Sequence, residues 1–268
     1  MEFLIAVDME GIHGVVGEPN VRYSLTEDYK RAIGYAAKEV NAVTETLFDL
    51  GATKVAVWDN HAGGGNLRFE EIDPRVTVID NKAYPTRMSF AKEHNFKGII
   101  FLGYHSKAGT ANGVLSHTYN SMEIQYAKIN GKTRGEIEID SWIAGTHGIA
   151  PILVASDDVC LAQIKELLPE TVGVITKYSK ARNEADYIDE DVFLNNLREG
   201  VKKAVQSQIK PVVCPMPAEL IVRYSRMEMA YWLIEKAQGL GIPVKNEHED
   251  GRVLTFTIEK ATDIVTCL

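Results

Sequence analysis

The chain has 268 residues, 37 acidic and 29 basic side chains, and a formal net charge of −8. This length allows one large domain with a buried core, or a main domain with a small appendage. The acidic balance argues against a nucleic-acid-binding protein, because phosphate contacts need clustered Lys and Arg.

The cysteines and the N-terminus give a first expectation of where the protein works. Cys160, Cys214 and Cys267 are far apart and form no CxxC motif, so we expect buried or free thiols rather than disulfides or metal ligands. Such thiols suit a reducing compartment. The apolar stretch at residues 3–7 is too short for a signal peptide or a membrane span. We therefore expect a cytoplasmic protein with no membrane partner.

Three short apolar runs predict buried parallel strands, and each is followed by polar side chains. The runs are 3–7, 55–58 and 99–103. Asp8 and Glu10 follow the first run, His61 follows the second, and His105 follows the third. Ligands in open α/β sheets bind beyond the carboxyl ends of parallel strands. Two carboxylates and two imidazoles are therefore expected at one edge of a sheet, a ligand set that suits Zn or Mn.

Helical and strand patterns alternate between and after these runs. Ser24 and Glu27 fit a capping box before a helix that stops at Gly51. Further elements are expected as a strand at 76–79, a helix at 86–94, a hairpin around Asn130-Gly131, a helix stopping near Gly148, a strand at 151–155, a helix from Asp157 or Asp158 to 168, a strand at 172–176 and a helix at 190–207. We therefore predict an α/β fold with a mainly parallel sheet and flanking helices.

Prolines mark a domain boundary near residue 210. Pro211, Pro215 and Pro217 fall close together, and a strand at 219–224, a helix at 227–238, a hairpin turning at Asp250-Gly251 and a short terminal helix are expected after them. We divide the chain into an α/β domain at 1–210, which carries the metal site, and a smaller C-terminal α+β lobe at 211–268. So short a lobe buries little apolar surface alone. We expect it to pack on the main sheet or on another subunit, and to restrict substrate size.

Each candidate ligand is ambiguous when taken alone. Asp8 and Glu10 are two residues apart, so both point to the same side of a continued strand and repel unless a cation lies between them. The same tripeptide could instead be a helix cap with a solvated Glu. His61 could be a hydrogen-bonded loop histidine, and Asp59 could either orient His61 or cap the following turn. The convergence of three strand ends is what favours a metal site.

Two further segments can complete this site. A glycine-punctuated loop at 106–118 brings His117 back toward the same edge. A histidine near a metal can serve as general acid or base or hold an oxyanion, although an exposed loop histidine is equally compatible with the sequence. Glu136 and Glu138 lie where the helix after the hairpin begins, and either could ligate a metal or merely favour the helix dipole.

Together these motifs resemble the D-aminopeptidases of the dipeptide-transport-operon type, a family of zinc aminopeptidases. The similar segments are 6–11, 59–61, 101–105, 113–117, 129–131 and 135–136, closely up to 155–158 and more loosely beyond. The resemblance implies a dinuclear zinc site. Its metal ligands would be Asp8, Glu10, His61, His105 and Glu136, with His117 as the catalytic histidine. It also implies a ring-like homo-oligomer, such as a decamer, that encloses its active sites.

The predicted activity is removal of the N-terminal residue of short peptides, with D-alanine-like N-termini, by metal-activated water. Five ligands are too few to saturate two ions singly, so Asp8 is expected to bridge them. An acidic site attracts a free α-ammonium and thereby selects peptide N-termini. Two alternatives stay open. One is a dinuclear phosphoesterase, for which Arg134 and Lys107 are the basic residues near the motifs; the other is a metal-binding assembly subunit without turnover.

Overall fold

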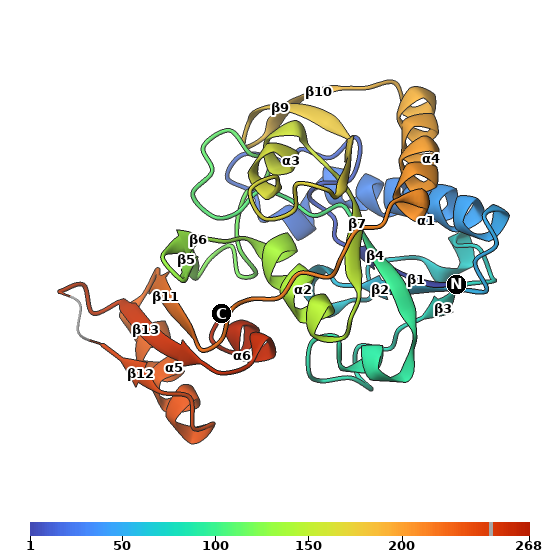
Figure 1. Cartoon of the computed structure of the whole chain (residues 1–268). Helices are drawn as coiled ribbons and strands as arrows, with labels where there is room; N and C mark the ends of the chain where they lie inside the picture. Colours follow the sequence, from blue (N-terminus) through green and yellow to red (C-terminus); the bar gives the residue numbers. More distant parts are fainter. Residues whose placement is uncertain (247–248) are drawn as a thin grey trace.

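A six-stranded parallel sheet forms the centre of the computed structural model (Figure 1), which describes residues 1–246 and 249–268. The strands run in the order β3-β2-β1-β4-β7-β8, and neighbouring strands are parallel throughout. Their bounds are β1 Glu2–Val7, β2 Lys54–Asp59, β3 Thr77–Val78, β4 Phe96–Leu102, β7 Ala150–Ser156 and β8 Val172–Ile175. The predicted fold class, α/β with a mainly parallel sheet, is confirmed.

Helices cover both faces of this sheet, which explains why its strands read as continuous apolar runs. Side chains alternate along β1: Ile5 belongs to the core shared with α1 (Glu27–Asp49) and α4 (Glu190–Gln206). Leu4 belongs to the opposite core, which it shares with α2 (Glu136–Thr146) and α3 (Asp158–Ile164). Both faces are therefore dry, and the polar residues that follow the strands stand out at the sheet's carboxyl edge.

A five-stranded antiparallel sheet forms the C-terminal lobe, in the order β12-β13-β11-β5-β6. Its strands are β5 Ile124–Ile129, β6 Lys132–Thr133, β11 Ala218–Tyr224, β12 Val244–Lys245 and β13 Val253–Ile258, and α5 (Met227–Gly239) and α6 (Ala261–Thr266) accompany them. Two of these strands, β5 and β6, precede residue 210 and form the hairpin expected at Asn130-Gly131. Apolar residues of the lobe share one core cluster with α2. The division into 1–210 and 211–268 stays a prediction.

Several local elements differ from the sequence-based expectation. The first long helix is capped by Thr26, whose side chain accepts a hydrogen bond from the Tyr29 amide, rather than by Ser24. The expected helix at 86–94 is the 3₁₀ helix η4 (Ser89–Glu93), and α3 ends at Ile164 rather than at 168. The remaining 3₁₀ helices are η1 Tyr23–Leu25, η2 His61–Gly63 and η3 Phe69–Glu71. The antiparallel pair β9 (Lys177–Ala181) and β10 (Glu184–Tyr187) had no counterpart among the predicted elements.

Cys160, Cys214 and Cys267 are buried and free of disulfides, in agreement with the expectation for the thiols. In the part of the chain that the structure describes, no helix has the length and apolar character needed to cross a membrane.

Candidate metal centre

The carboxyl ends of β2, β1 and β4 lie side by side, which brings together the polar residues that follow them. β1 pairs with β2 on one side and with β4 on the other. Asp8 follows β1 directly, His61 begins η2 just after β2, and His105 lies three residues after β4. Glu136 enters from the N-terminus of α2. The structure therefore brings the five predicted ligands into one cluster.

Two glycines let these strand ends approach closely. A Cβ atom on Gly11 would lie 1.9 Å from the Tyr104 carbonyl oxygen, and one on Gly103 would lie 2.0 Å from the Asp8 carbonyl oxygen. Gly103 also has a φ of +73°, which side-chain-bearing residues rarely adopt. The Gly11 amide donates a hydrogen bond to the Gly103 carbonyl at 2.6 Å. Backbone contact at these glycines thus holds the segment of Asp8 against that of His105.

Asp8 lies between two groups of donor atoms. Its Oδ1 is 2.9 Å from Nδ1 of His61, which is in turn 3.2 Å from Oε2 of Glu10. Its Oδ2 is 3.6 Å from Nε2 of His105, which is 3.4 Å from Oε1 of Glu136. Each carboxylate oxygen of Asp8 therefore faces one imidazole and one further carboxylate. This is the arrangement that a carboxylate bridging two cations needs.

Some buried donor atoms of the cluster have no hydrogen-bond partner in the protein, as expected for ligands of divalent ions. Glu10 Oε2 and His105 Nε2 are buried and make no hydrogen bond, although each has ionisable neighbours within 4 Å. Such atoms are costly to bury without a partner. Two sets of potential ligand atoms lie within 4.8 Å of one another: Asp8, Glu10 and His105; and His105, His117 and Glu136. Oxygen and imidazole donors without thiolate suit zinc.

The charges of the cluster support the same interpretation. Burial opposes charge on His61, yet the Glu10 and Asp8 carboxylates raise the pKa of this imidazole to about 12. Burial likewise opposes charge on His105, and the neighbouring Glu136 carboxylate raises the pKa of this imidazole to about 10. Burial, followed by the charge of Glu10, raises the pKa of Asp8 to about 7. Protons on the imidazoles thus supply positive charge among the carboxylates, a role that a bound cation takes over while releasing those protons.

Hydrogen bonds outside the cluster orient its donors. Nδ1 of His105 lies 3.0 Å from the Ser106 carbonyl, so this nitrogen carries the proton and Nε2 is left to face the site. The Tyr119 amide donates to Glu136 Oε1 at 2.6 Å. Nδ1 of His117 lies 2.8 Å from the Leu115 carbonyl, and the His117 ring stacks on His105 with centroids 4.0 Å apart. The Nε2 atom of His117 is 4.0 Å from Glu136.

The two ambiguous acids, Asp59 and Glu138, have structural partners. Asp59 accepts hydrogen bonds from the amides of Asn66 and Leu67, so it fastens the turn after β2. Glu138 accepts from the Gly135 amide at 2.7 Å and pairs with Arg134 at 3.1 Å. Glu138 is therefore a helix-capping residue, and Glu136 is the acid that faces the imidazoles.

A buried polar network behind the cluster had no signal in the sequence. Arg87 forms two hydrogen bonds to Asp140, at 2.5 and 2.6 Å. The hydroxyls of Tyr104 and Tyr119 donate to the same carboxylate. Tyr119 is the residue whose amide binds Glu136, and Tyr104 precedes His105. The network thus supports the site through Tyr104 and Tyr119, which adjoin the candidate ligands. Its Arg87 and Asp140 are 53 positions apart in the sequence.

The cluster opens into a cavity of about 750 Å³. Its floor includes Asp8, Glu10, His117 and Glu136, and its walls include the segment 20–24 and the tip of the β9–β10 hairpin. The basic residues that line it are Arg22, Arg87 and Arg182. Arg134 and Lys107, the basic residues nearest to the motifs in sequence, do not line it. Arg134 pairs with Glu138.

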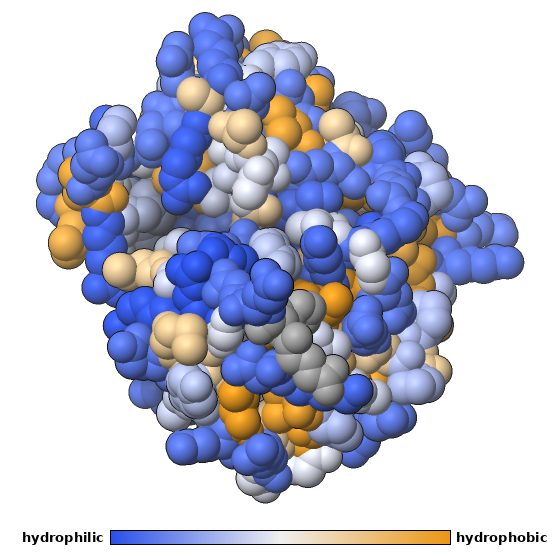
Figure 2. Space-filling view, turned by 90° about the vertical axis from the view of Figure 1, so that its left-hand side faces the viewer, coloured by the Kyte–Doolittle hydropathy of each residue, from blue (hydrophilic) through white to orange (hydrophobic). Residues whose placement is uncertain are grey.

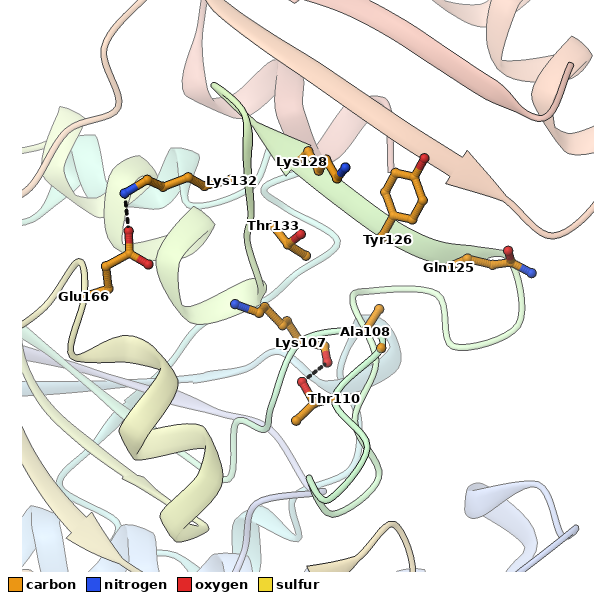
Figure 3. A pocket seen from close by; sticks show the side chains of 10 residues that line it. Lys107, Ala108, Thr110, Gln125, Tyr126, Lys128, Lys132, Thr133 and Glu166 are labelled. Carbon is orange, nitrogen blue, oxygen red and sulfur yellow. Dashed lines mark hydrogen bonds and ion pairs between the residues drawn. The ribbon is translucent and has the colours of Figure 1, made fainter. Parts of the chain in front are cut away.

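Lys107 faces a different hollow (Figure 3). Lys128, Lys132 and Glu166 also line this second hollow, and Lys132 forms an ion pair with Glu166. It has no lining residue in common with the site cavity.

A parallel sheet with acids and imidazoles gathered at its carboxyl edge is typical of metal-dependent hydrolases. The sequence profile of the D-aminopeptidase family matches residues 1–268, and the chain belongs to this family of peptide-bond hydrolases. The resemblance found in the sequence and the assignment as an aminopeptidase are therefore confirmed.

Matches to D-aminopeptidase from Bacillus subtilis, in sequence and in structure, support the family assignment. A D-aminopeptidase of strain 168 is 28% identical over 234 residues, which are 87% of this chain and 84% of the relative. The solved structure of Zn-dependent D-aminopeptidase DppA, described as a self-compartmentalizing protease, superposes with a TM-score of 0.86 at 25% identity. That match covers 100% of this chain and 95% of DppA.

Proposed function

We propose that the chain is a dinuclear zinc aminopeptidase that hydrolyses the N-terminal peptide bond of short peptides beginning with a D-amino acid such as D-alanine. The observation that carries this proposal is the position of Asp8 between two groups of donors. Asp8, Glu10 and His61 would hold one ion, and Asp8, His105 and Glu136 would hold the other. When bound, such a pair of ions polarises a carbonyl and lowers the pKa of water to about 7.

The side chains of the chain itself would bind and orient the peptide. The cavity is rich in carboxylates, including Glu18 on its wall, and these attract the α-ammonium of a peptide. An N-terminus is therefore preferred over an internal peptide bond. Because His61 and His105 would bind the ions, His117 is the histidine of the cavity that is available for proton transfer.

His117 has the protonation state that a general base needs. Burial and the neighbouring His105 lower its pKa, so the imidazole is neutral at neutral pH. Because Nδ1 donates to the Leu115 carbonyl, the lone pair is on Nε2. We propose that this atom accepts a proton during hydrolysis and returns it to the leaving amine. A ligand role is the alternative, because His117 also lies within reach of His105 and Glu136.

We further propose that the protein acts in the cytoplasm as a ring-like homo-oligomer, such as a decamer. The free, buried thiols fit a reducing compartment. The self-compartmentalizing description of DppA supports an assembly. The face that presents the lobe is mostly hydrophilic, with hydrophobic residues gathered in a few groups (Figure 2). On α5, Tyr231 and Trp232 are exposed and could contact a second copy.

The proposal is tested by elemental analysis together with a substrate panel. We expect two zinc ions per chain, cleavage of alanyl dipeptides with a preference for D-alanine at the N-terminus, and loss of cleavage on chelation with recovery on adding zinc. A phosphodiester such as bis(p-nitrophenyl) phosphate serves as the comparison substrate. Turnover of the phosphodiester but not of the peptides would contradict the proposal, and so would a single ion per chain for its dinuclear part.

A further inference from the structure

The site cavity has cationic side chains on its wall as well as carboxylates on its floor. Of its three arginines, Arg87 is partly buried, with 15% of its side chain exposed, and forms two hydrogen bonds to Asp140, so its charge is already balanced. Arg22 and Arg182 are exposed. Among the described residues 1–246 and 249–268, no carboxylate forms an ion pair with Arg182. The cavity therefore has buried carboxylates at its floor, and two exposed arginines together with Glu18 on its wall.

Arg182 occupies a fixed place on this wall. It lies between β9 and β10 at the tip of their hairpin, next to Asn183. Its Nη1 donates to the Ser116 carbonyl at 2.6 Å, and its own carbonyl accepts from the Leu115 amide at 2.9 Å. Asn183 Nδ2 donates to the Val16 carbonyl at 3.0 Å. The hairpin tip is thus fastened to the loop of His117 on one side and to the segment after β1 on the other.

This placement brings a guanidinium into the same cavity as His117. Ser116, which Arg182 contacts, directly precedes His117 in the chain. A guanidinium has five N–H donors, and the contact with Ser116 uses only one of those on Arg182. The others are available to a carboxylate, which a guanidinium binds in a planar, two-point geometry. An extended dipeptide spans roughly 7 Å, a length that such a cavity accommodates.

We infer that Arg182 binds the α-carboxylate of the substrate, so that the cavity selects peptides of two or three residues with both termini free. This inference rests on the proposed aminopeptidase function. It adds that the enzyme recognises the C-terminal carboxylate of the substrate. The contact is remote from the scissile bond and is made equally in the ground state and the transition state. It therefore lowers KM and leaves kcat nearly unchanged.

The test compares an alanyl dipeptide with its C-terminal amide, in the handedness that the wild type cleaves faster. A charge-assisted contact of this kind corresponds to about a 10- to 100-fold change in binding. We therefore expect the KM of the wild type to be about 10- to 100-fold higher for the amide than for the free acid. Arg182→Ala should raise KM for the free acid alone by the same factor, while kcat and zinc content stay near wild type. The KM of Arg182→Lys for the free acid should lie between those of the wild type and Arg182→Ala.

Two controls separate recognition from folding. Lys128→Ala removes a cation from the second hollow (Figure 3) and should leave both KM values unchanged. If Arg182 merely braced the loop of His117, its substitution would affect the acid and the amide equally, and the inference would be overturned. An amide-to-acid ratio that is the same in wild type and Arg182→Ala would also overturn it.

A binding measurement keeps this inference distinct from the proposed function. Calorimetric titration of His117→Ala protein with the acid and the amide gives the same comparison without turnover. A wild type that cleaves neither peptide would contradict the proposed function. Preferential binding of the acid that disappears in the His117→Ala, Arg182→Ala double variant would still support the carboxylate subsite, and equal binding of acid and amide would refute it.

Discussion

Asp8 is the residue on which the proposed pair of ions depends most. Its two oxygens face different imidazoles, whereas Glu10 forms an ion pair with His61 and has His105 farther away, within 4.8 Å. We expect Asp8→Ala to lose both ions and Glu10→Ala to lose one, because only the former removes a ligand from each ion. Elemental analysis measures the difference, and Glu138→Ala is the matched control because that carboxylate binds Gly135 and Arg134. Equal metal loss in the Asp8 and Glu10 variants would argue against bridging.

His117 can be tested separately from the ligands. We expect His117→Ala to keep its zinc and lose about 10²- to 10⁴-fold in kcat, the usual contribution of a general acid or base. Zinc analysis and peptide kinetics on one preparation decide between the roles. Loss of zinc would make His117 a ligand, and unchanged kcat would move the proton-transfer role to another group.

Glu39 gives a pH dependence of stability that can be assigned to one side chain. It is fully buried in α1, where its Oε1 accepts from the His13 amide and its Oε2 makes no hydrogen bond. Burial raises its pKa from 4.5 to about 8. Between these values the folded state holds a proton that the unfolded state lacks. The stability that this proton contributes is therefore fully present below pH 4.5 and is lost as pH rises toward 8.

Glu39→Gln removes this dependence, because the amide resembles the protonated acid and does not titrate. The free energy of unfolding of the wild type should fall relative to that of the variant by about 1.4 kcal/mol per pH unit inside this window. Urea titrations of chelator-treated protein at several pH values measure the difference. A difference that is constant from pH 5 to pH 8 would show that Glu39 is ionised in the folded protein.

At the residue scale, the sequence predicted what lies at strand ends and missed what comes from elsewhere. Asp8, His61 and His105 could be recognised because each follows an apolar run, and parallel strands share one carboxyl edge. Arg87 and Asp140 lie far apart in sequence and meet only through tertiary packing. Arg182 was missed because it lies at the tip of a hairpin that the sequence pattern did not predict.

At the scale of elements, Gly103 is the connection between β4 and the metal cluster. Alanine there would combine a left-handed backbone with a Cβ 2.0 Å from the Asp8 carbonyl. Gly51→Ala is the matched control, since Gly51 has a φ of +86° in open space. We expect Gly51→Ala to cost about 1–2 kcal/mol of stability. Gly103→Ala should cost more and should also reduce zinc content, as measured by denaturation and metal analysis. Equal costs would mean that the close approach at Gly103 is easily relieved.

Elements with a strong apolar period were predicted well, and short or polar ones were not. The helix at 190–207 closely matches α4. The β9 strand, Lys177–Ala181, contains two lysines, and Lys177 is fully buried because its ammonium donates to the carbonyls of Glu10 and Ile12. A lysine in that role resembles a loop residue in sequence. Its partners are about 165 positions away, beyond the reach of local patterns.

At the scale of the whole molecule, the lobe is built from two separated parts of the chain. The β11 strand pairs with β5 as well as with β13, so the lobe's sheet includes the hairpin around Asn130-Gly131. The sequence predicted both the hairpin and the later strands. It could not show that they pair, because antiparallel register between distant segments depends on packing rather than on local composition.

The exposed face of α5 provides the test of the proposed assembly. Tyr231 and Trp232 are 57% and 51% exposed, and aromatic side chains of this kind are enriched at protein interfaces. We expect the Tyr231→Glu, Trp232→Glu double variant to form smaller species than the wild type, because burying two new charges at a contact is strongly unfavourable. Val192→Glu is the control, since Val192 is 51% exposed on α4 of the main domain and lies outside the lobe.

Multi-angle light scattering measures the mass of each variant, and zinc content shows whether each subunit remains folded. A double variant with wild-type mass would show that α5 takes no part in the assembly, while a smaller mass with full zinc content would show that the lobe joins the subunits without building the metal site.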